Sequence, residues 1–474
     1  MAAVKYFLVV PDGVGIRNFF CTRVIDLLLE SGEVVVWHAL PRESVAPFQA
    51  RWGSRLRWVD LPRIHDGVAE RFFRQAKIFA QLYWQGKQTT DIQLKRRRPP
   101  SRLKARLLYS AARLIGRISS RPGGILWLDR MHCKAAARAP HMKEFMTFLD
   151  HERPSMLFCT HQRALEAVPA MLAARELGIR SAVFIYSWDN LPKGRMPVYA
   201  DTYVVWSDYM KAELLKYYPD VIPERVDVVG TPQFENYFDR SLIVPREQFF
   251  SELGLDTGRP VVCFSGNDVT SPFDPFYLED LAVALQNIPA EHRPQILFRR
   301  SPVDTSDRFD DVLRRHPEIA VSNPRWQLVK GGEWSQLVPT QEDGTLLVNV
   351  VYHSDIVVNV GSTMGMDFAI FDKPGIYIAY NPAGSDGRWN IHEVYKLPHF
   401  VPVHQIQPIY WARSSQELGD LVLRGLTHKS EKSLERKAWL DLIVSQPLEK
   451  ASERFAEEIQ KLAREGNVPR VPAE

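Results

Sequence analysis

The sequence predicts an α/β protein of two halves, each built on a doubly wound parallel sheet. Short apolar runs typical of buried parallel strands alternate with amphipathic helical segments along most of the chain. The length of 474 residues exceeds one typical domain and suits two domains of roughly 200 residues each. An apolar content of 45% and a charged content of 24% are ordinary for a soluble globular protein.

The strand-like runs fall into two series separated by a polar stretch. The first series comprises residues 5–10, 34–37, 155–159, 181–185, 202–205 and 226–229. The second series comprises residues 261–264, 295–298, 319–321, 356–360 and 375–379. We therefore place a first Rossmann-like domain at 1–240 and a second at 241–431, and we assign 432–474 to C-terminal helices and a tail.

The most informative strand end follows the run at 356–360. Gly361-Ser362-Thr363 ends the strand, and a helical pattern that carries Asp367 begins directly after it. Such a turn offers free backbone N–H groups and the positive end of a helix dipole to an anion. Asp367 lies about one turn into the helix, where its carboxylate suits a sugar hydroxyl. The plainer alternative is an ordinary turn between a strand and a helix.

Two other strand ends of the second half carry residues suited to a phosphate. Ligands of doubly wound sheets bind outside the carboxyl ends of the strands. Arg299 and Arg300 follow one run, and each guanidinium can offer two parallel donors to a diphosphate. Ser265-Gly266-Asn267 follows another run and would allow close backbone approach. The alternatives are ion pairs of the arginines with Asp304 or Asp307, and a plain turn.

These segments resemble the donor site of GT-B-fold glycosyltransferases. The resemblance rests on Ser354-Asp355 through Gly361-Ser362-Thr363, Asp367 and Lys373-Pro374, and on Pro11-Asp12-Gly13-Val14-Gly15 after the first strand. It implies two Rossmann-like domains facing a cleft, with C-terminal helices crossing back. It also implies a nucleotide-sugar donor in the second domain and an acceptor in the first, with Gly13 and Gly15 in the acceptor-side loop.

One departure from the family pattern concerns the stereochemistry of transfer. Retaining members often carry two glutamates around the donor-side turn. Here Asp367 matches the second of them, while Asn359 occupies the place of the first. The departure favours an inverting transfer, which needs a general base beside the acceptor hydroxyl.

Strand ends of the first half supply the candidates for that base. Asp12 lies in the glycine loop after the first run, and His161 directly follows a buried run. Asp189 is a third candidate, and the neighbouring Trp188 suits stacking on an acceptor sugar. Ordinary alternatives exist, because aspartate also favours helix caps and turns.

A basic segment stands apart from the strand pattern. Between Asp91 and Asp129 the sequence contains no acidic residue. Apolar residues recur there with helical spacing near 101–118, which predicts a basic amphipathic helix of the kind that lies on anionic lipid. The residues expected to contact the membrane are Arg96, Arg97, Arg98, Arg102, Lys104 and Arg106. The alternatives are a solvated basic face on a helix packed against the domain, and binding to a polyanionic acceptor.

Charge, motifs and apolar runs limit the partners, cofactors and cellular locations that we expect. A net charge of +4 without a nucleic-acid module argues against nucleic-acid binding. Four scattered cysteines without a CxxC pair, and no DxD motif in a donor loop, predict metal independence and no cofactor beyond the sugar donor. The N-terminus has no signal layout and no apolar run is long enough to span a membrane, so we expect a cytoplasmic location or a peripheral one at the inner face of the cell membrane.

The sequence therefore predicts a glycosyltransferase that builds a surface glycan or glycolipid from a nucleotide-sugar donor and a glycan or lipid-linked acceptor. A polyol-phosphate transferase of the CDP-glycerol type is the nearest rival, although that family usually has histidines at both half-sites, and Arg299-Arg300 stand at one of them here. A sugar-nucleotide epimerase of the same fold is another rival. The non-enzymatic alternative is a membrane-surface scaffold that has kept the fold and lost activity.

Overall fold

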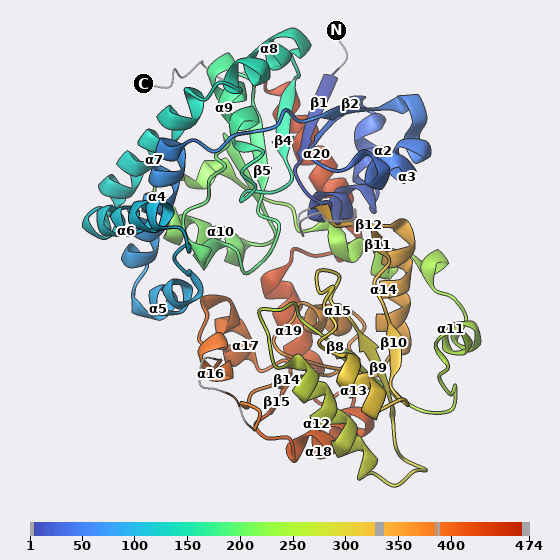
Figure 1. Cartoon of the computed structure of the whole chain (residues 1–474). Coiled ribbons are helices and arrows are strands. Elements are labelled where there is room, and N and C mark those ends of the chain that lie inside the picture. Colours follow the sequence, from blue (N-terminus) through green and yellow to red (C-terminus); the bar gives the residue numbers. More distant parts are fainter. Residues whose placement is uncertain (1–3, 328–335, 384, 386–388, 467–474) are drawn as a thin grey trace. The chain divides into compact units, whose positions relative to one another are not determined.

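The computed structural model describes residues 4–327, 336–383, 385 and 389–466 (Figure 1). The chain forms two compact units. The first unit contains the chain up to Glu235, residues 336–338 and the segment from Ile443 onward. The second contains Asn236–Gln327 and Pro339–Leu442. The chain therefore leaves the first unit near the expected boundary at 240, contributes residues 336–338 to it, and rejoins it at Ile443.

A seven-stranded parallel sheet forms the centre of the first unit, in the order β3-β2-β1-β4-β5-β6-β7. Its strands are β1 (Val4–Val10), β2 (Gly32–His38), β3 (Leu56–Asp60), β4 (Met156–Cys159), β5 (Ser181–Phe184), β6 (Thr202–Val205) and β7 (Val226–Val228). The middle strand β1 pairs on both sides, with Val9 opposite Trp37 and Cys159. The central strands β1, β4 and β5 are mostly apolar and mostly buried, as expected for a sheet covered on both faces.

The C-terminal helix α20 (Ala451–Arg464) is part of the core of the first unit. It contacts α2 (Val24–Leu29), β1 and β4. Phe455 on its apolar face lies against Phe19 and Phe158, with ring centroids 4.9 Å apart in both pairs. The last helix of the chain thus completes the cover of a sheet whose first strand begins at Val4.

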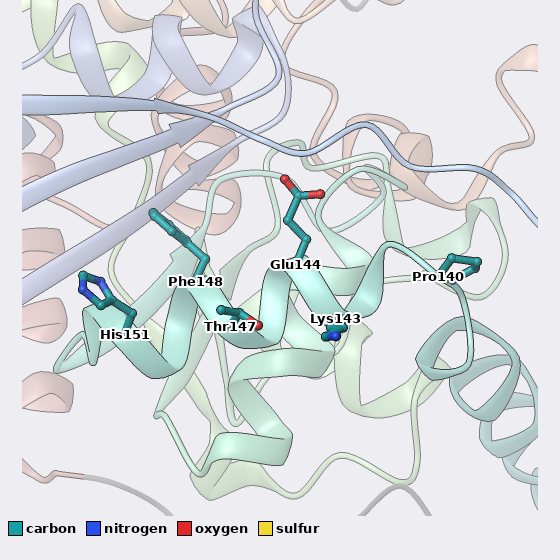
Figure 2. Close-up of a pocket in the computed structure, with 6 residues that line it drawn as sticks. All are labelled: Pro140, Lys143, Glu144, Thr147, Phe148 and His151. Carbon is teal, nitrogen blue, oxygen red and sulfur yellow. The ribbon is translucent and has the colours of Figure 1, made fainter.

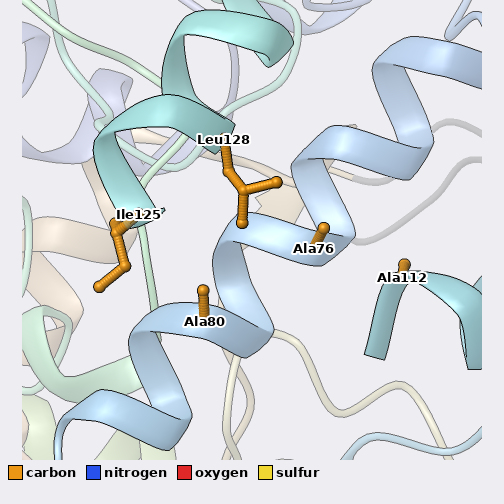
Figure 3. Close-up of a cluster of buried hydrophobic side chains, with 5 residues drawn as sticks. All are labelled: Ala76, Ala80, Ala112, Ile125 and Leu128. Atoms are coloured by element: carbon orange, nitrogen blue, oxygen red, sulfur yellow. The ribbon is translucent and has the colours of Figure 1, made fainter. Parts of the chain in front are cut away.

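Four further helices form a group beside this sheet (Figure 1). They are α4 (Val68–Trp84), α5 (Lys87–Arg96), α6 (Leu103–Ile118) and α7 (Pro122–Ala137). Both α6 and α7 pack on α4. Figure 3 shows the small residues at this contact, where Ala76 and Ala80 of α4 meet Ala112, Ile125 and Leu128. In the part of the chain that the structure describes, no helix is long and apolar enough to cross a membrane.

The second unit contains a six-stranded parallel sheet in the order β10-β9-β8-β13-β14-β15. Its strands are β8 (Val261–Ser265), β9 (Gln295–Arg299), β10 (Ala320–Ser322), β13 (Ile356–Asn359), β14 (Gly375–Ile378) and β15 (Tyr410–Ala412). Helices between the strands include α12 (Asp274–Gln286), α14 (Gln341–His353), α15 (Met364–Ile370) and α18 (Glu417–Thr427). The predicted fold class, two parallel-sheet α/β halves, is confirmed.

Two strands of the large parallel sheets were missing from the sequence prediction, and the basic helix lies close to where it was expected. The missed strands are β3 and β15, which lie at sheet edges. The basic helix was expected near 101–118, and α6 begins at Leu103 with Arg102 as its N-cap residue.

Candidate functional site

Both sheets reverse their strand order at one point, and the candidate residues lie at these two points. In the first unit, successive strands run outward from β1 to one side and from β4 to the other. In the second unit the same reversal falls between β8 and β13. Crevices at such reversals, outside the carboxyl ends of the strands, are the usual ligand sites of doubly wound sheets. Asp12 and His161 follow β1 and β4, and Asn267 and Ser362 follow β8 and β13.

Asp12 and His161 form a buried hydrogen-bonded pair. The Oδ2 atom of Asp12 contacts Nδ1 of His161, and the two side chains are 4% and 6% exposed. The other carboxylate oxygen accepts hydrogen bonds from the backbone N–H groups of Val14 and Gly15, at 3.0 and 3.3 Å. Asp12 is therefore both the cap of a helical turn and the partner of the histidine, so the two candidate bases belong to one arrangement.

Close backbone approach at Gly13 and Gly15 allows this pair to form. A Cβ atom at Gly15 would lie 2.5 Å from the Thr160 hydroxyl oxygen, beside His161 in sequence. A Cβ atom at Gly13 would lie 1.9 Å from the Leu337 carbonyl oxygen. A side chain at Gly15 would push the loop away from the end of β4, and one at Gly13 would push it away from Leu337. The glycines thus have a packing role, and their predicted acceptor role remains a prediction.

The free nitrogen of the His161 ring is the unusual feature of the pair. Nε2 is buried and has no hydrogen-bond partner among the described residues. The edge of the ring meets Tyr186, with centroids 4.1 Å apart. Burial raises the pKa of the Tyr186 phenol to about 12, so this neighbour stays neutral. An unpaired buried polar atom costs free energy, and such atoms are often explained by a catalytic role or an absent ligand.

The charge state of Asp12 follows from its surroundings. Burial alone would raise its pKa, but His161 and the backbone N–H groups of Gly15 and Val14 outweigh burial and hold the pKa below its ordinary value. The carboxylate is consequently ionised at neutral pH. An ionised Asp12 can accept a proton carried on Nδ1 of His161, and in that tautomer the Nε2 lone pair is the one that can take a proton.

The loop after β5 places Trp188 and Asp189 differently from each other. Trp188 is buried. Asp189 accepts a hydrogen bond from the Ser187 hydroxyl at 2.7 Å and pairs with Lys193 at 2.6 Å, as a turn residue would. The acceptor-binding role of both residues remains a prediction.

Glu213, on α10 (Asp208–Tyr217), is a buried carboxyl that the sequence analysis did not single out. Burial raises the pKa of Glu213 to about 7, and the charge of Asp189 adds to the rise, against Lys216. A buried carboxyl among apolar helix positions has no distinctive sequence signal, which is why it was missed.

Glu213→Gln should stabilise the protein in a pH-dependent way. Below the ordinary glutamate pKa both folded and unfolded chains hold the proton, so the variant and its parent should unfold alike. Between that value and about 7 the unfolded chain loses the proton first, which destabilises the parent. At pH 8 the free energy of unfolding of Glu213→Gln should exceed that of the parent by up to about 3 kcal/mol. Urea unfolding at pH 5 and pH 8 measures it, and a gain equal at the two pH values would contradict the raised pKa.

In the second unit, the turn after β13 is half-exposed and closed by its own hydrogen bonds. Asn359 is buried, and its Oδ1 accepts the Ser362 N–H at 2.9 Å. The Ser362 hydroxyl accepts the Met364 N–H at 3.4 Å, and its carbonyl accepts the Tyr377 hydroxyl at 3.0 Å. Gly361 has a φ of +61°, and a Cβ there would lie 2.6 Å from the Phe400 ring. The Asn359 side chain thus shapes the turn.

The turn after β8 is fixed to the turn after β13. The Asn267 side-chain amide donates to the Val360 carbonyl at 3.0 Å. Gly266 lies against Phe298 and Phe309, where a Cβ would be 3.1 and 3.3 Å from their rings. Ser265, the last residue of β8, is buried. Backbone groups from both sides of the reversal point are therefore held together, as a site for an extended ligand requires.

Arg308 holds the same loop and was not predicted. Its guanidinium donates to the carbonyl oxygens of Ser271, Asn267 and Asp268 at 2.6, 2.7 and 3.1 Å, and its Nε pairs with Asp304 at 2.6 Å. Asp304, named above only as an alternative partner for Arg299 or Arg300, is thus paired with a third arginine.

Arg299 and Arg300 occupy different environments. Arg299 is buried and pairs with Asp343 at 2.8 Å, with both side chains below a tenth exposed. Arg300 is 16% exposed and donates to the Ser306 carbonyl at 2.7 Å. Arg300 is therefore the one of the two that a phosphate can reach without breaking a buried ion pair. These contacts do not test whether either arginine binds a donor phosphate, so that role remains a prediction for Arg299 and for Arg300.

Asp367 lies in the first turn of α15 and is buried. Its Oδ1 accepts the Tyr237 hydroxyl at 2.9 Å. A ribose hydroxyl would share the carboxylate with this tyrosine. The Thr363 side chain makes no cap hydrogen bond to α15 and is half-exposed, so it is open to a ligand at this end of the helix.

Other places on the described surface offer less chemistry. A depression of about 610 Å³ lies beside α8 (Met142–Glu152). Pro140 and five side chains of that helix line it and are drawn as sticks in Figure 2. The depression contains no strand-end residue. No group of three or more histidine, cysteine, aspartate or glutamate side chains with metal-site geometry occurs among the residues that the structure describes.

Solved structures of other proteins share this fold. No protein-family model matches the chain, and no curated protein is similar to it in sequence. A glycosyltransferase from Rickettsia africae ESF-5 is similar in structure, with a TM-score of 0.52, 9% identity, and coverage of 98% of this chain and 99% of that one. The fold is GT-B. The UDP-GlcNAc 2-epimerase from Methanocaldococcus jannaschii matches with a TM-score of 0.54 and 10% identity, over 97% of this chain and all of that one (100%).

A second epimerase structure contains a ligand. The UDP-GlcNAc 2-epimerase from Neisseria meningitidis bound to UDP-GlcNAc matches with a TM-score of 0.50 and 9% identity, over 97% of this chain and 100% of that one. At such identities the likeness establishes the GT-B fold and leaves the reaction open.

Proposed function

We propose that this protein transfers a sugar from a nucleotide-sugar donor to a hydroxyl of a glycan or lipid-linked acceptor, with inversion and without a metal. The observation that carries the proposal is the Asp12–His161 pair, with Nε2 of His161 unpaired among the described residues. Its place at the strand-order reversal of the first sheet supports a role in ligand chemistry.

In the proposed reaction His161 is the general base and Asp12 its positioning residue. The acceptor hydroxyl gives its proton to Nε2 while its oxygen forms a bond to the anomeric carbon of the donor. The bond from that carbon to the phosphate oxygen breaks, and its electron pair leaves with the nucleotide. Asp12 keeps the proton on Nδ1 and stabilises the imidazolium that forms.

The donor would be held by the reversal point of the second sheet. Ser362, Thr363 and the turn at 265–267 would meet the diphosphate, Arg300 would pair with it, and Asp367 would hold the ribose. Support comes from the half-exposed turn at Gly361–Thr363 and from its tie to Asn267. Asn359 in place of the family's first glutamate favours inversion.

Donor affinity should fall in Arg300→Ala and in Asp367→Asn, which keeps its size but loses the anionic acceptor. We expect a loss of about 1.5–3 kcal/mol for the arginine, as for a hydrogen bond to a charged group. Calorimetry with the matching nucleotide measures both. Arg314→Ala, an exposed arginine paired with Asp311, is the matched control. Unchanged affinity in Arg300→Ala would remove that residue from the site, and a lost cooperative melt in Asp367→Asn would make Asp367 structural.

A sugar-nucleotide epimerase is the second candidate, because two of the structural neighbours named above are epimerases. An epimerase leaves the sugar attached to its nucleotide, whereas a transferase releases the nucleotide. A thermal-shift screen against UDP-, GDP-, CMP-, CDP- and dTDP-linked donors identifies the donor for either reaction. The CDP-glycerol-type alternative predicts the largest shift with CDP-glycerol.

We include in the proposal a peripheral position at the inner face of the cell membrane, where a lipid-linked acceptor would be met. Its support is the segment between Asp91 and Asp129, which carries ten basic residues and no acidic one. The ten are Lys95, Arg96, Arg97, Arg98, Arg102, Lys104, Arg106, Arg113, Arg117 and Arg121. The Arg96 side chain lies outside the described residues.

A further inference from the structure

The apolar residues of α6 divide into two opposite faces. Ala112 and Gly116 face α4, and a Cβ at Gly116 would lie 2.5 Å from Cβ of Phe79. Leu103, Leu107, Leu114 and Ile118 are instead between 59% and 71% exposed. At about 100° per residue these four positions fall within roughly 60° of one another on the helix. They form one outward stripe, which we call the α6 stripe.

Such a stripe is not needed for the packing of α6. The contact with α4 is already made by the small residues on the opposite face (Figure 3). Isolated exposed leucines are ordinary, but four aligned on one helix mark a surface that is covered in use. The charges beside the stripe indicate the kind of partner that covers it. Arg106, Arg113 and Arg117 on α6 are exposed, and no acidic residue occurs in the whole segment 92–128.

A cavity of about 410 Å³ lies under the inner side of the same helix. Its lining combines Phe72, Leu108 and Ala112 with the arginines Arg97 and Arg98. Neither arginine makes an ion pair to a carboxylate within the described part of the chain. The Arg97 guanidinium donates to the Lys193 carbonyl at 3.5 Å.

Two polar atoms at this cavity lack partners. Nε of Arg97 and Oε1 of Gln75 are buried and unpaired among the residues described. Burial lowers the pKa of Arg97 to about 10, and the nearby charge of Arg163 adds to this. Even so, Arg97 stays cationic at neutral pH. An anionic ligand with an apolar part would suit this cavity. Its charge would pair with the Arg97 guanidinium, which has no carboxylate partner among the described residues, and its apolar part would contact the apolar lining.

We propose that α6 docks on an anionic phospholipid bilayer, with the α6 stripe inserted at the interface and a lipid phosphate held beside Arg97 and Arg98. The apolar stripe contributes burial, and the arginines contribute attraction to the anionic headgroups. Snorkelling would let Arg106, Arg113 and Arg117 reach the headgroups around the inserted stripe. This inference rests on the peripheral position proposed above and is independent of the sugar-transfer chemistry.

Vesicle sedimentation of the full-length protein tests the inference. The vesicles are phosphatidylcholine alone, and phosphatidylcholine with a one-third share of phosphatidylglycerol. We expect binding to the anionic vesicles only. The paired change Leu107→Ser and Leu114→Ser should lower the partition coefficient about tenfold or more, because the lost apolar burial is that of two leucines. Arg98→Gln should lower the partition coefficient about fivefold, which is the usual contribution of one basic residue near an anionic surface.

Matched controls come from α19 (Ser433–Ile443) in the second unit. Leu434 is 81% exposed and the Lys437 side chain 73%, so Leu434→Ser and Lys437→Gln remove the same kinds of group elsewhere. Vesicle binding should be unchanged in both. Equal binding of the α6 variants and these controls would overturn the proposal, as would equal binding to neutral vesicles.

The same variants also test one other partner, a second copy of this chain. A dimer seen by sedimentation velocity that dissociates in the leucine variant, with no vesicle binding by the parent, would make a second copy of this chain the occupant and overturn the proposal. Donor turnover without vesicles should be the same in the α6 variants and the parent. Loss of membrane binding with intact turnover therefore separates this inference from the proposed function.

Discussion

His161→Ala should lower kcat by about 10²–10⁴, the usual contribution of a general base. Donor affinity should change little, since the proposed donor contacts belong to the second unit. The side chain is buried between Asp12 and Tyr186, so His161→Gln serves as a variant of similar bulk that lacks a basic nitrogen. Initial rates at saturating donor measure the loss, with a thermal melt as a check on folding.

Asp12→Asn should show the same defect because Asp12 acts through His161. Asparagine can still accept the Val14 and Gly15 N–H groups, but it no longer stabilises the imidazolium or fixes the proton on Nδ1. We expect a loss of about 10²–10⁴ in kcat, with the double variant no slower than His161→Ala. If the loss of kcat in the double variant equalled the product of the two single losses, Asp12 and His161 would not act as one unit. A larger loss in Asp12→Asn, with His161→Ala near parental activity, would make Asp12 the base.

Arg299→Ala should destabilise the second unit by about 3–5 kcal/mol, the cost of breaking a buried ion pair. The change leaves the carboxylate of Asp343 buried, with the Arg325 N–H and the Trp326 Nε1 as remaining donors, both at 2.7 Å. Urea unfolding followed by Trp fluorescence measures the loss.

A control separates this effect from the loss of a surface charge. Arg314→Ala removes an arginine whose pair with Asp311 is about three-quarters exposed, and it should unfold like the parent. Parental stability of Arg299→Ala would show that the Asp343 pair contributes little. In that case a donor-affinity defect in Arg299→Ala could be read as a direct phosphate contact.

The buried strands were predictable and two edge strands were not. A central strand such as β13 is buried on both faces, so its sequence is a continuous apolar run. The edge strand β3 reads Leu-Arg-Trp-Val-Asp, with both an arginine and an aspartate exposed, and lacks that signal. The other edge strand, β15, has three residues, too few for a periodic pattern.

The strand-end rule located Asp12 and His161, but their partnership depended on topology. They lie 149 positions apart, and only the pairing of β1 with β4 brings them together. The same limit hid Asp343, which pairs with Arg299 across 44 positions from a helix. The sequence pattern indicated which residues follow the ends of buried strands. It did not indicate which of them were already bound to other residues of the protein.

The basic helix illustrates a different limit. Helical spacing grouped all its apolar residues, among them Leu107 and Ile115, as though one face were apolar. The structure places Leu107 outward at 63% exposure and Ile115 against the α4 cluster. Only the position of α4 distinguishes a helix with one apolar face from a helix with two.

The central claim is that the Asp12–His161 pair transfers a sugar from its nucleotide. The most direct measurement is phosphorus and proton NMR of the protein incubated with the donor that gives the largest thermal shift, with water as the acceptor. We predict slow release of the free nucleotide and a sugar whose first-formed anomer is inverted, both lost in His161→Ala. An intact nucleotide carrying an epimerised sugar, a retained anomer, or release of CMP from CDP-glycerol without consumption of any nucleotide sugar would contradict the account.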